Sequence, residues 1–550
     1  MSTLETLVMN TVEAAYVSCF GQTPSDAFLR IKPTDKPEFG DFTSNIAMMA
    51  AKELGKNPRE IGATLIEAIE SADPSGIDRV ELAGPGFVNF FLSPTAYQDA
   101  LSGLLEQGDA YGSLQIGKGK RLQIEFVSSN PTGPLTVGHG RQAVLGDVLA
   151  TLYERIGFDV HREYYFNDEG RQIDLLAESL WVRYRGLFDD VREVPEDGYQ
   201  GAYLKTVAED LKRDLVEPFP EFTDETKELF RKEAVSRMTA VIKDDLEHLG
   251  IQFDTWFSES TLHHDGKVSD TLKLLQDHEG VFEEEGALWL KAEAYGGAKD
   301  SVLIRSDGRP TYLMVDIAYH LDKKTRGFDQ VLDVQGADHH AEQTCVKAAL
   351  RMLAYPDEWL QYAVHQFVSL KEGGQPMKMS TRAGRFVTLR DLTEDLGKDI
   401  VRYFMISRKP EAHLDFDLDL ARAESLDNPV TYIQYAYTRI RSIFRKTGLE
   451  PHALASADRA ALVEAEELAL IRTLDQFPHI IEHAAVDFAP HALSEYALQL
   501  ARSFHAYYDK HRVLVDDEAL QTARLSLLAG VLQVLGQSLT FLGMETPEEM

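Results

Sequence analysis

The sequence predicts a multidomain α/β protein: a parallel-sheet domain with a helical insertion, preceded by a small α+β domain and followed by an all-α bundle. Three observations predict this class. The chain has 550 residues, too many for one hydrophobic core. From residue 121 an apolar strand, a Gly- and Pro-rich loop, a helix and a second strand follow one another in the order of a βαβ unit. Beyond about residue 428 only helical periodicity occurs.

The N-terminal domain is expected to span residues 1–112. It opens with apolar residues at helical spacing, namely Leu4, Leu7, Val8, Val12 and Ala15. A Pro- and Gly-punctuated stretch over 31–45 precedes a second helix predicted over 46–54, and VELAGPGFVNFFL (80–92) has strand character. These elements indicate a small α+β domain.

The middle domain is expected to span 113–425. LQIEFV (122–127) is an apolar run with one acid, typical of a strand in a parallel sheet. A helix ending at Gly157 and a strand at 158–166 complete the unit. Strand-like runs return further along the chain, at 301–306 and 330–340.

A largely helical, acidic insertion is expected within this domain, over about 187–298. Its segment 189–247 carries 9 basic and 17 acidic residues, which is typical of solvated helix faces. The remaining residues, 426–550, are expected to form the helical bundle.

The charge of the chain excludes a protein that grips nucleic acid over its whole surface. Lys and Arg number 56 against 89 Asp and Glu, for a net charge of −33. Residues 1–110 contribute −9, from 7 basic and 16 acidic residues, and 189–247 contribute −8. A local basic groove is still compatible with this average.

Cysteine usage and hydropathy predict a soluble, cytoplasmic protein. The two cysteines, Cys19 and Cys345, give neither a disulfide framework nor zinc spacing. Acids among the first thirty residues argue against a secretory signal. The uncharged stretch 525–544 is interrupted by glycines and polar residues, so we expect a buried bundle helix there rather than a membrane span.

Two loops carry the residue types needed to bind a polyphosphate. In EFVSSNPTGPLTVGHGRQAVLGD (125–147) a strand end, a Gly- and Pro-rich turn and a helix start aim backbone amides at a crevice, with His139 at the helix start. MKMSTRAGRFVTL (377–389) is a basic, hydroxyl-bearing loop suited to a mobile clamp. Each loop alone is equally typical of an ordinary solvated turn.

Together the loops resemble the HIGH and KMSKS signatures of class I aminoacyl-tRNA synthetases, and the surrounding sequence resembles the bacterial arginyl-tRNA synthetases. Matching segments occur in the family's order: PTDKPEFGDFTSNIAM (33–48), AGPGFVNFF (83–91), NPTGPLTVGH (130–139), EYYFNDEGRQI (163–173), PTYLMVDIAYHLDK (310–323), GADHH (336–340), HLDFDLDLA (413–421) and DNPVTYIQYAYTRI (427–440). The resemblance implies a Rossmann-like catalytic domain, an anticodon-binding C-terminal bundle and a tRNA-contacting N-terminal domain. It implies arginine–tRNA ligase activity with ATP as substrate and Mg²⁺ as a cofactor.

The resemblance also implies the site residues. The implied catalytic residues are His139, Lys378, Ser380 and Arg382. ATP contacts fall to Thr136, Gly138, His139, Gly336, Asp338, His340 and Met379. Arginine contacts fall to Glu125, Asn130, Tyr312 and Asp316. No protein metal site is expected.

Two positions depart from the family's signatures. Thr136 replaces the first histidine of HIGH, which leaves a hydroxyl in place of an imidazole. Thr381 replaces a lysine of KMSKS, so Lys378, Arg382 or Arg385 must supply the positive charge.

A guanidinium substrate requires planar carboxylate recognition. Glu125 lies in an apolar strand, and Asp316 follows Tyr312 by four residues, so both differ from ordinary surface acids. Lysine should be rejected, because it leaves acceptors of the pocket unpaired.

The helix YIQYAYTRIRSIFRK (432–446) combines cations with aromatic rings and has no acid, as single-stranded RNA recognition requires. Its candidate tRNA contacts are Tyr432, Tyr435, Arg439, Arg441, Arg445 and Lys446. A second such patch lies at 502–512, and 32–39 is the candidate contact of the N-terminal domain. Rings packed in the bundle core with solvated cations are the alternative interpretation.

Two other functions fit part of the sequence. Another class I synthetase, for cysteine or glutamate, is disfavoured by the lack of a zinc-binding cysteine set and by the Tyr312–Asp316 pair. A degenerate paralogue that binds tRNA or a protein partner without charging fits Thr136 and Thr381. The expected partners are ATP, L-arginine and tRNA(Arg), with a monomeric state and no membrane.

Overall fold

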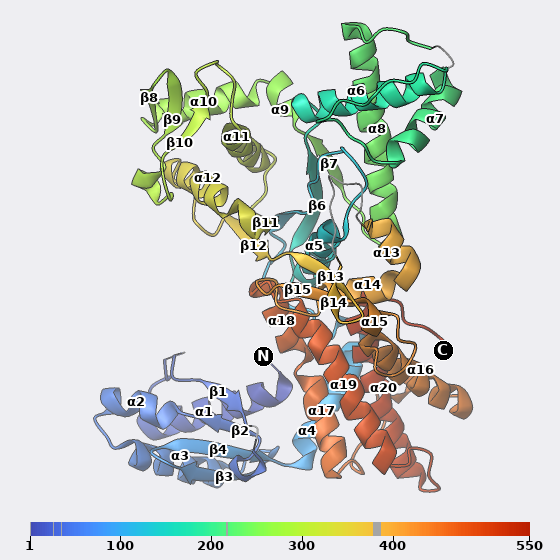
Figure 1. Cartoon of the computed structure of the whole chain (residues 1–550). Helices are drawn as coiled ribbons and strands as arrows, with labels where there is room; N and C mark the ends of the chain where they lie inside the picture. Colours follow the sequence, from blue (N-terminus) through green and yellow to red (C-terminus); the bar gives the residue numbers. More distant parts are fainter. Residues whose placement is uncertain (1, 26, 35, 216–217, 378–386, 550) are drawn as a thin grey trace.

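The centre of the protein is a five-stranded, all-parallel sheet of order β12-β11-β5-β6-β7 (Figure 1). The computed structural model describes residues 2–25, 27–34, 36–215, 218–377 and 387–549. The strands of the central sheet are β5 (Arg121–Glu125), β6 (Asp159–Phe166), β7 (Thr255–Ser258), β11 (Gln330–Gly336) and β12 (Leu360–His365). The predicted strands over 122–127, 158–166 and 330–340 are confirmed.

The helices α5 (Val137–Arg155), α11 (Tyr312–Thr325) and α12 (His340–Met352) pack on this sheet, whereas α6 (Arg171–Gly186) packs with the helices of the insertion. α5 approaches the sheet closely because it carries a glycine at the contact, where a Cβ on Gly146 would meet the Phe126 ring at 2.2 Å. α11 is buried nearly all round, and Thr311 caps its first turn by accepting from the Met314 N–H.

The N-terminal domain packs helices on an antiparallel sheet of order β1-β2-β4-β3. Its strands are β1 (Ile31–Pro33), β2 (Phe42–Ser44), β3 (Ile77–Ala83) and β4 (Phe87–Leu92), and its helices are α1 (Thr3–Phe20), α2 (Ile46–Leu54), α3 (Pro58–Ala72) and α4 (Pro94–Gln107). Both predicted helices are confirmed. The predicted strand run 80–92 is a hairpin, because Gly84 and Gly86 adopt the positive φ of a tight turn.

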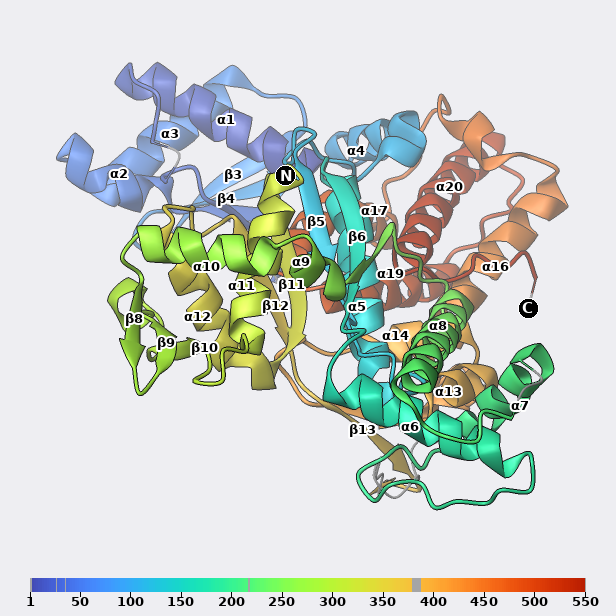
Figure 2. The same ribbon diagram turned by 90° about the horizontal axis from the view of Figure 1, so that it is seen from above.

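The insertion is less helical than the sequence predicts (Figures 1 and 2). Its first part is helical, α7 (Tyr203–Leu215) and α8 (Asp224–His248). The chain then returns to the central sheet as β7 before α9 (Ser260–His264), α10 (Lys267–Asp277) and a separate antiparallel sheet of β8 (Val281–Glu284), β9 (Ala287–Leu290) and β10 (Ser301–Ile304). Strands of four residues are too short to impose a recognisable period.

A small sheet of order β14-β13-β15 follows, with β13 (Val368–Glu372), β14 (Gln375–Pro376) and β15 (Leu414–Asp417). Short helices accompany it: α13 (Leu389–Leu396), α14 (Lys398–Met405) and α15 (Leu418–Ala421). Single 3₁₀ turns occur at Pro37–Phe39, Gly108–Ala110, Glu293–Tyr295, Ala337–His339 and Pro451–Leu454.

The C-terminal residues form the predicted helical bundle. Its helices are α16 (Pro429–Thr447), α17 (Ala465–Asp475), α18 (Phe477–Val486), α19 (His491–Lys510) and α20 (Glu518–Phe541). Within the described part of the chain, α20 alone is long and apolar enough to pass a test for a membrane span, and 67% of the apolar window is buried inside the protein. α20 is therefore the core helix of the bundle, as expected.

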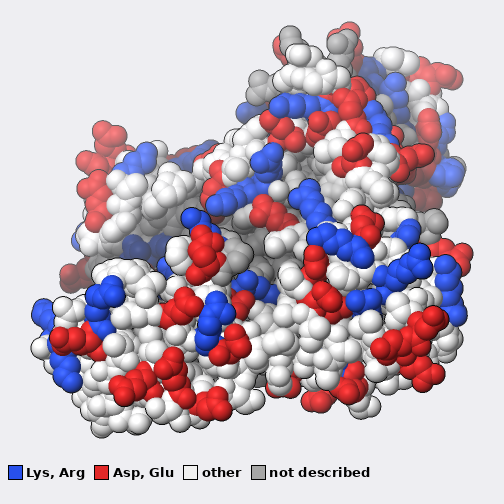
Figure 3. All heavy atoms as spheres, turned by 90° about the horizontal axis from the view of Figure 1, so that it is seen from below, with Lys and Arg blue, Asp and Glu red and all other residues white. Residues whose placement is uncertain are grey.

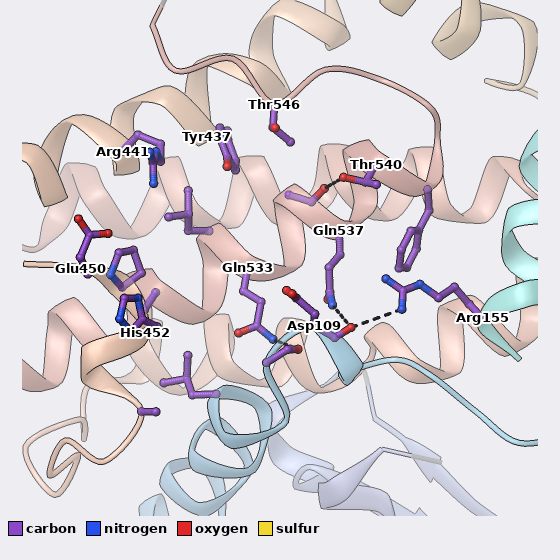
Figure 4. Close-up of a pocket in the computed structure, with 18 residues that line it drawn as sticks. Asp109, Arg155, Tyr437, Arg441, Glu450, His452, Gln533, Gln537, Thr540 and Thr546 are labelled. Carbon is purple, nitrogen blue, oxygen red and sulfur yellow. Dashed lines mark hydrogen bonds between the residues drawn. The ribbon is translucent and has the colours of Figure 1, made fainter. Parts of the chain in front are cut away.

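The three domains meet where the residues after α4 cross the bundle (Figure 4). Gln533 and Gln537 of α20 donate to the carbonyl oxygens of Gly108 and Asp109 at 2.7 and 3.0 Å, beside a cavity of about 750 Å³. The carboxylate of Asp475, at the end of α17, accepts from the first backbone amides of α1. These bonds tie the N-terminal domain to the bundle.

Candidate active site

A cavity of about 830 Å³ opens at the carboxyl edge of the central sheet, where parallel α/β folds bind their ligands. Residues from several segments of the middle domain line it. They are Glu125, Val127, Ser128, Ser129, Asn130, Thr136, Gly138, His139, Gln142, Tyr165, Gln172, Glu259, Tyr312, Asp316, Tyr319, Val334, Gln335, Gly336, Asp338, His339, Glu342, His365 and Phe367.

The loop after β5 is bent sharply at the floor of the cavity. Val127 and Ser128 have φ angles of 68° and 41°, in the left-handed region that branched and bulky residues avoid. The bend brings the Ser128 hydroxyl back to donate to Glu125 Oε1 at 2.8 Å. Glu125, in the last position of β5, is 9% exposed, and burial raises the pKa of its carboxyl while the Lys323 ammonium opposes the rise.

The start of α5 fixes the tautomer of His139. The backbone N–H of Thr136 lies 3.0 Å from His139 Nδ1, and because an amide can only donate there, Nδ1 is the acceptor. Burial lowers the pKa of His139, so the neutral ring carries its proton on Nε2. Thr136 thus positions His139 as a neutral donor, a function that its side-chain chemistry alone did not indicate.

Carboxylates gather on the side of the cavity formed by α11 and by the residues before α9. Tyr312 begins α11 at the mouth and is 67% exposed, while Asp316 is partly buried one turn further on. Glu259 is 8% exposed and accepts from the Asn167 amide at 2.7 Å and from the Tyr165 hydroxyl at 2.5 Å. Burial raises the pKa of Glu259.

Asn130 and the turn after β11 form the rest of the predicted lining. The Asn130 amide donates to Gln172 at 3.0 Å, so two side chains of the cavity orient each other. Gly336 and Asp338 line the cavity as predicted. His339, rather than His340, is the histidine of this turn that lines it, because His340 already begins α12.

Several lining residues were not identified from the sequence. Neither Glu259 nor Tyr165 has sequence neighbours that mark it as a site residue. The hydrogen bond between them forms only because the chain returns to the central sheet at β7. His365, at the end of β12, has a buried Nε2 that makes no hydrogen bond to any described residue, and burial lowers its pKa to about 4. A neutral imidazole with a free acceptor at this place is available to a ligand.

The second signature falls outside the described residues. Lys378, Met379, Ser380, Thr381, Arg382 and Arg385 belong to the segment 378–386. The C-terminal flank of that segment is near the cavity: Thr388 forms an isolated antiparallel bridge with Thr136, and Leu389 N donates to Leu135 O at 2.8 Å.

The six candidate tRNA contacts on α16 divide into two groups. Tyr435, Arg439, Arg445 and Lys446 line a groove of about 360 Å³ together with Tyr508 of α19. Arg439 lies 4.7 Å from the Tyr508 ring centroid, and Tyr435 stacks on His505. Arg441 faces the cavity of Figure 4, where it pairs with Glu548 at 2.7 Å, and the Tyr432 ring packs edge-on against His505.

Charge is mixed on the face that holds the N-terminal domain and the bundle, with acidic and basic side chains interspersed (Figure 3). Of the predicted segment 32–39, residue 35 lies outside the described residues. Within this segment the Lys36 ammonium lies 5.9 Å from the Phe39 ring centroid, so a cation and an aromatic ring are neighbours there.

Three family models match the chain in order: "Arginyl tRNA synthetase N terminal domain" over 2–92, "tRNA synthetases class I (R), catalytic domain" over 100–411 and "DALR anticodon binding domain" over 433–550. The chain is 44% identical to the arginine–tRNA ligase of Thermotoga maritima, with 96% of each covered. It is 40% identical to that of Coxiella burnetii, with 100% of this chain and 99% of the relative covered. The solved structure of Thermus thermophilus arginyl-tRNA synthetase shares the fold, with a TM-score of 0.74 at 24% identity and 99% of both chains covered.

Proposed function

We propose that this chain, which belongs to the arginyl-tRNA synthetase family, activates L-arginine with ATP and transfers it to tRNA(Arg). The observation that carries the proposal is the division of one cavity into two chemically different sides. Glu125, Asp316 and Glu259 supply acceptors for a cationic substrate, and the amides at the start of α5 with His139 supply donors for an anionic one.

In the first half-reaction, a carboxylate oxygen of arginine attacks the α-phosphorus of ATP, the bond to the bridging oxygen breaks, and pyrophosphate leaves. Positioning and charge stabilisation account for most of the acceleration of such an in-line displacement. His139, neutral and protonated on Nε2, donates to a phosphate oxygen without giving up its proton. Lys378, Ser380 and Arg382 are proposed to stabilise the leaving pyrophosphate, and Met379 is a proposed ATP contact.

Arginine is held by Glu125 and Asn130 at its backbone groups and by Tyr312 and Asp316 at its guanidinium. Glu259 is a further acceptor on the same side of the cavity. The adenosine is proposed to lie along Gly336 and Asp338, with His339 in the place expected for His340. In the second half-reaction a hydroxyl of the terminal tRNA ribose attacks the arginyl carbonyl carbon, and AMP leaves.

We further propose that Mg²⁺ accompanies ATP and neutralises charge on its phosphates. Among the described residues no group of three or more His, Cys, Asp or Glu side chains could hold a metal ion. The proposed domains are 1–112, 113–425 with the insertion, and 426–550, in a cytoplasmic monomer. The α16 groove is the proposed anticodon contact.

Two assays on the purified protein test this function. The first is ATP–pyrophosphate exchange with each amino acid, with and without tRNA; the second is charging of total tRNA. Exchange that depends on arginine and requires cognate tRNA, together with arginine-specific charging, is expected. Tight tRNA binding with no charging of any amino acid would establish the degenerate paralogue instead.

A further inference from the structure

Three carboxylates stand side by side in the middle of the central sheet. The strand register aligns Glu163 of β6 with Glu125 of β5, and Glu125 with Asp333 of β11. Residues in register on neighbouring strands project to the same face, so the acids form a row. Glu163 and Asp333 are fully buried. Such a row is unfavourable unless cations are built in beside it.

One face of α11 supplies these cations. Lys323, which has no exposed surface, donates from Nζ to Glu125 Oε2 at 2.7 Å and to Asp333 Oδ1 at 2.8 Å. His320 precedes it by three residues and lies against the same row, with Nε2 at 2.8 Å from Asp333 Oδ2. At the other end of the row, Arg326 binds Glu163 at 2.8 Å.

His320 connects the row to the cavity. Its Nδ1 lies 2.8 Å from the Asp316 carbonyl oxygen and 3.1 Å from Asp316 Oδ1, while Nε2 faces Asp333. Both ring nitrogens therefore face acceptors, which requires an imidazolium with two N–H donors. Burial and Lys323 oppose this charge, but Asp316 and Asp333 raise the pKa of His320 to about 10.

We infer that Lys323 and His320 are positioning residues that hold the carboxylates of Glu125 and Asp316 correctly turned for a cationic amino acid. Neither cation reaches the cavity, so neither contacts substrate. Lys323 contacts Oε2 of Glu125, and His320 contacts Oδ1 of Asp316. The other oxygen of Asp316, Oδ2, makes no hydrogen bond to any described residue. The inference rests on the proposed function, because it assumes that the cavity binds arginine.

Charge balance explains why two internal cations are needed. Within this cluster, Glu125, Asp316 and Asp333 against Lys323 and His320 leave one negative charge, which favours a cationic substrate. Without Lys323, Glu125 would be a buried acid beside Asp333, and it would take up a proton near neutral pH instead of accepting from the substrate ammonium. Arginine binding would then depend on pH.

Other titratable groups around the row of acids do not replace Lys323 and His320. They are Tyr165 and Glu163 on β6, Tyr362 on β12, Tyr319 on α11 and Glu342 on α12. Burial raises the pKa of Tyr165, Tyr319 and Tyr362, so these phenols stay neutral. Arg326 is committed to Glu163.

The test compares K323M with the charge-balanced double variant K323M/D333N in arginine-dependent ATP–pyrophosphate exchange with tRNA. K323M alone leaves Glu125 without a cation and Asp333 with His320 as its remaining cation, and it should lower Tm. The double variant removes one charge of each sign and should regain most of that loss. In the double variant we expect the arginine KM to rise at least about tenfold while the ATP KM stays within about twofold. The arginine KM should fall again from pH 6.5 to 8.5, whereas that of the wild type stays flat.

A purely structural role is excluded by the matched control R524M. Arg524 is also a buried cation bonded to a buried acid, Glu467 at 2.8 Å, but it lies in the bundle. R524M should lower Tm without changing the arginine KM. An arginine KM within about twofold of wild type and independent of pH in K323M/D333N would overturn the inference.

H320Q decides the question if the double variant does not fold. Glutamine keeps a donor toward Asp333 and removes the donor toward Asp316, so the arginine KM should rise while the ATP KM does not. An unchanged arginine KM in H320Q would overturn the inference. A wild-type protein without arginine-dependent exchange would instead refute the proposed function.

Discussion

The proposed arginine pocket and the α16 groove, which is the proposed anticodon contact, hold their own charges differently. Under the pocket, Glu163 and Asp333 are buried, and each carboxylate has a cation of α11 or Arg326 within 2.8 Å. In the groove, Arg439 and Lys446 are solvent-accessible, and Arg445 is 45% exposed beside Glu549. The charges of the first region are held by buried contacts, whereas the cations of the second are held by exposed contacts such as that of Arg439 with the Tyr435 hydroxyl.

This difference fits the sizes of the two proposed ligands. A small substrate gains affinity and selectivity from acceptors that are already desolvated and oriented. A polyanion gains affinity from many weak, salt-sensitive contacts, none of which needs a fixed geometry. Substitutions in the pocket should therefore have large effects that salt does not change, and substitutions in the groove should have small effects that salt does change.

The largest expected effect follows the loss of Asp316. D316A removes the open acceptor of the pocket and leaves the His320 imidazolium with Asp333 as its remaining side-chain partner, so kcat/KM for arginine should fall about 100-fold or more. The measurement is arginine-dependent exchange, with the ATP KM and Tm as controls for the fold. An unchanged arginine KM would remove Asp316 from the pocket and break the comparison.

The buried row of acids and its cations should also make the free energy of unfolding depend on pH. Burial opposes the ionisation of Glu163, but Arg326 and His161 lower its pKa to about 2, from 4.5 in the unfolded chain. The stabilisation is therefore present above pH 4.5 and is lost as pH falls, by about 1.4 kcal/mol at pH 3.5. His320 has the opposite effect, because its pKa is raised to about 10 in the folded protein. The stabilisation from the protonated ring is complete below pH 6.5 and is lost as pH rises toward 10.

E163Q isolates the acidic part of this dependence. All four tryptophans, at 181, 256, 289 and 359, lie in the catalytic domain, so tryptophan fluorescence follows the unfolding of that domain and not of the bundle. The stability difference between wild type and E163Q should shrink by about 1.4 kcal/mol between pH 6 and 3.5. E372Q, which removes an exposed acid paired with Arg422, should show no such change. Parallel curves for wild type and E163Q would mean that the row is not ionised as described.

Much of the fold was predictable because its elements are long or have strong local signals. The helices 137–155 and 429–447 have clear periodicity, and the family and fold class expected from the motifs are confirmed. The insertion was predicted as largely helical, and the short strands β7, β8 and β9 were missed, whereas β10 falls within the predicted run 301–306. Four-residue strands are specified by their neighbours in space rather than by their own sequence.

Only the site residues that lie within recognisable sequence motifs were predictable. Glu125, Asn130, Gly138, His139, Tyr312 and Asp316 all line one cavity, although their individual roles remain proposals. Lys323 was not identified, since a lysine beside a second lysine near a helix end is typical of a solvated terminus. Its burial follows from the alignment of three acids on three strands, which depends on tertiary register.

A smaller effect is expected in the groove. R439A removes a cation beside Tyr435 and Tyr508, so the tRNA Kd should rise about fivefold, and the slope of log Kd against log salt should fall by about 1. The arginine KM should not change. R351A, which removes an exposed arginine paired with Asp357 far from the bundle, is the matched control. A loss of tRNA binding that is independent of salt would mean that Arg439 acts through packing.

The smallest expected effect concerns the acidic end of the chain. Glu548 pairs with Arg441 at 2.7 Å, and Glu549 lies 3.4 Å from Arg445, so these acids compete with RNA phosphates for two of the candidate contacts. Exposed pairs of this kind are weak and are screened by salt, so E548Q/E549Q should lower the tRNA Kd about twofold at low salt, and the gain should vanish at high salt. E545Q is the matched control, because Glu545 pairs with Lys398 instead of α16. Weaker tRNA binding by E548Q/E549Q would show that the acids order the groove rather than compete for it, and the groove would then resemble the prearranged pocket.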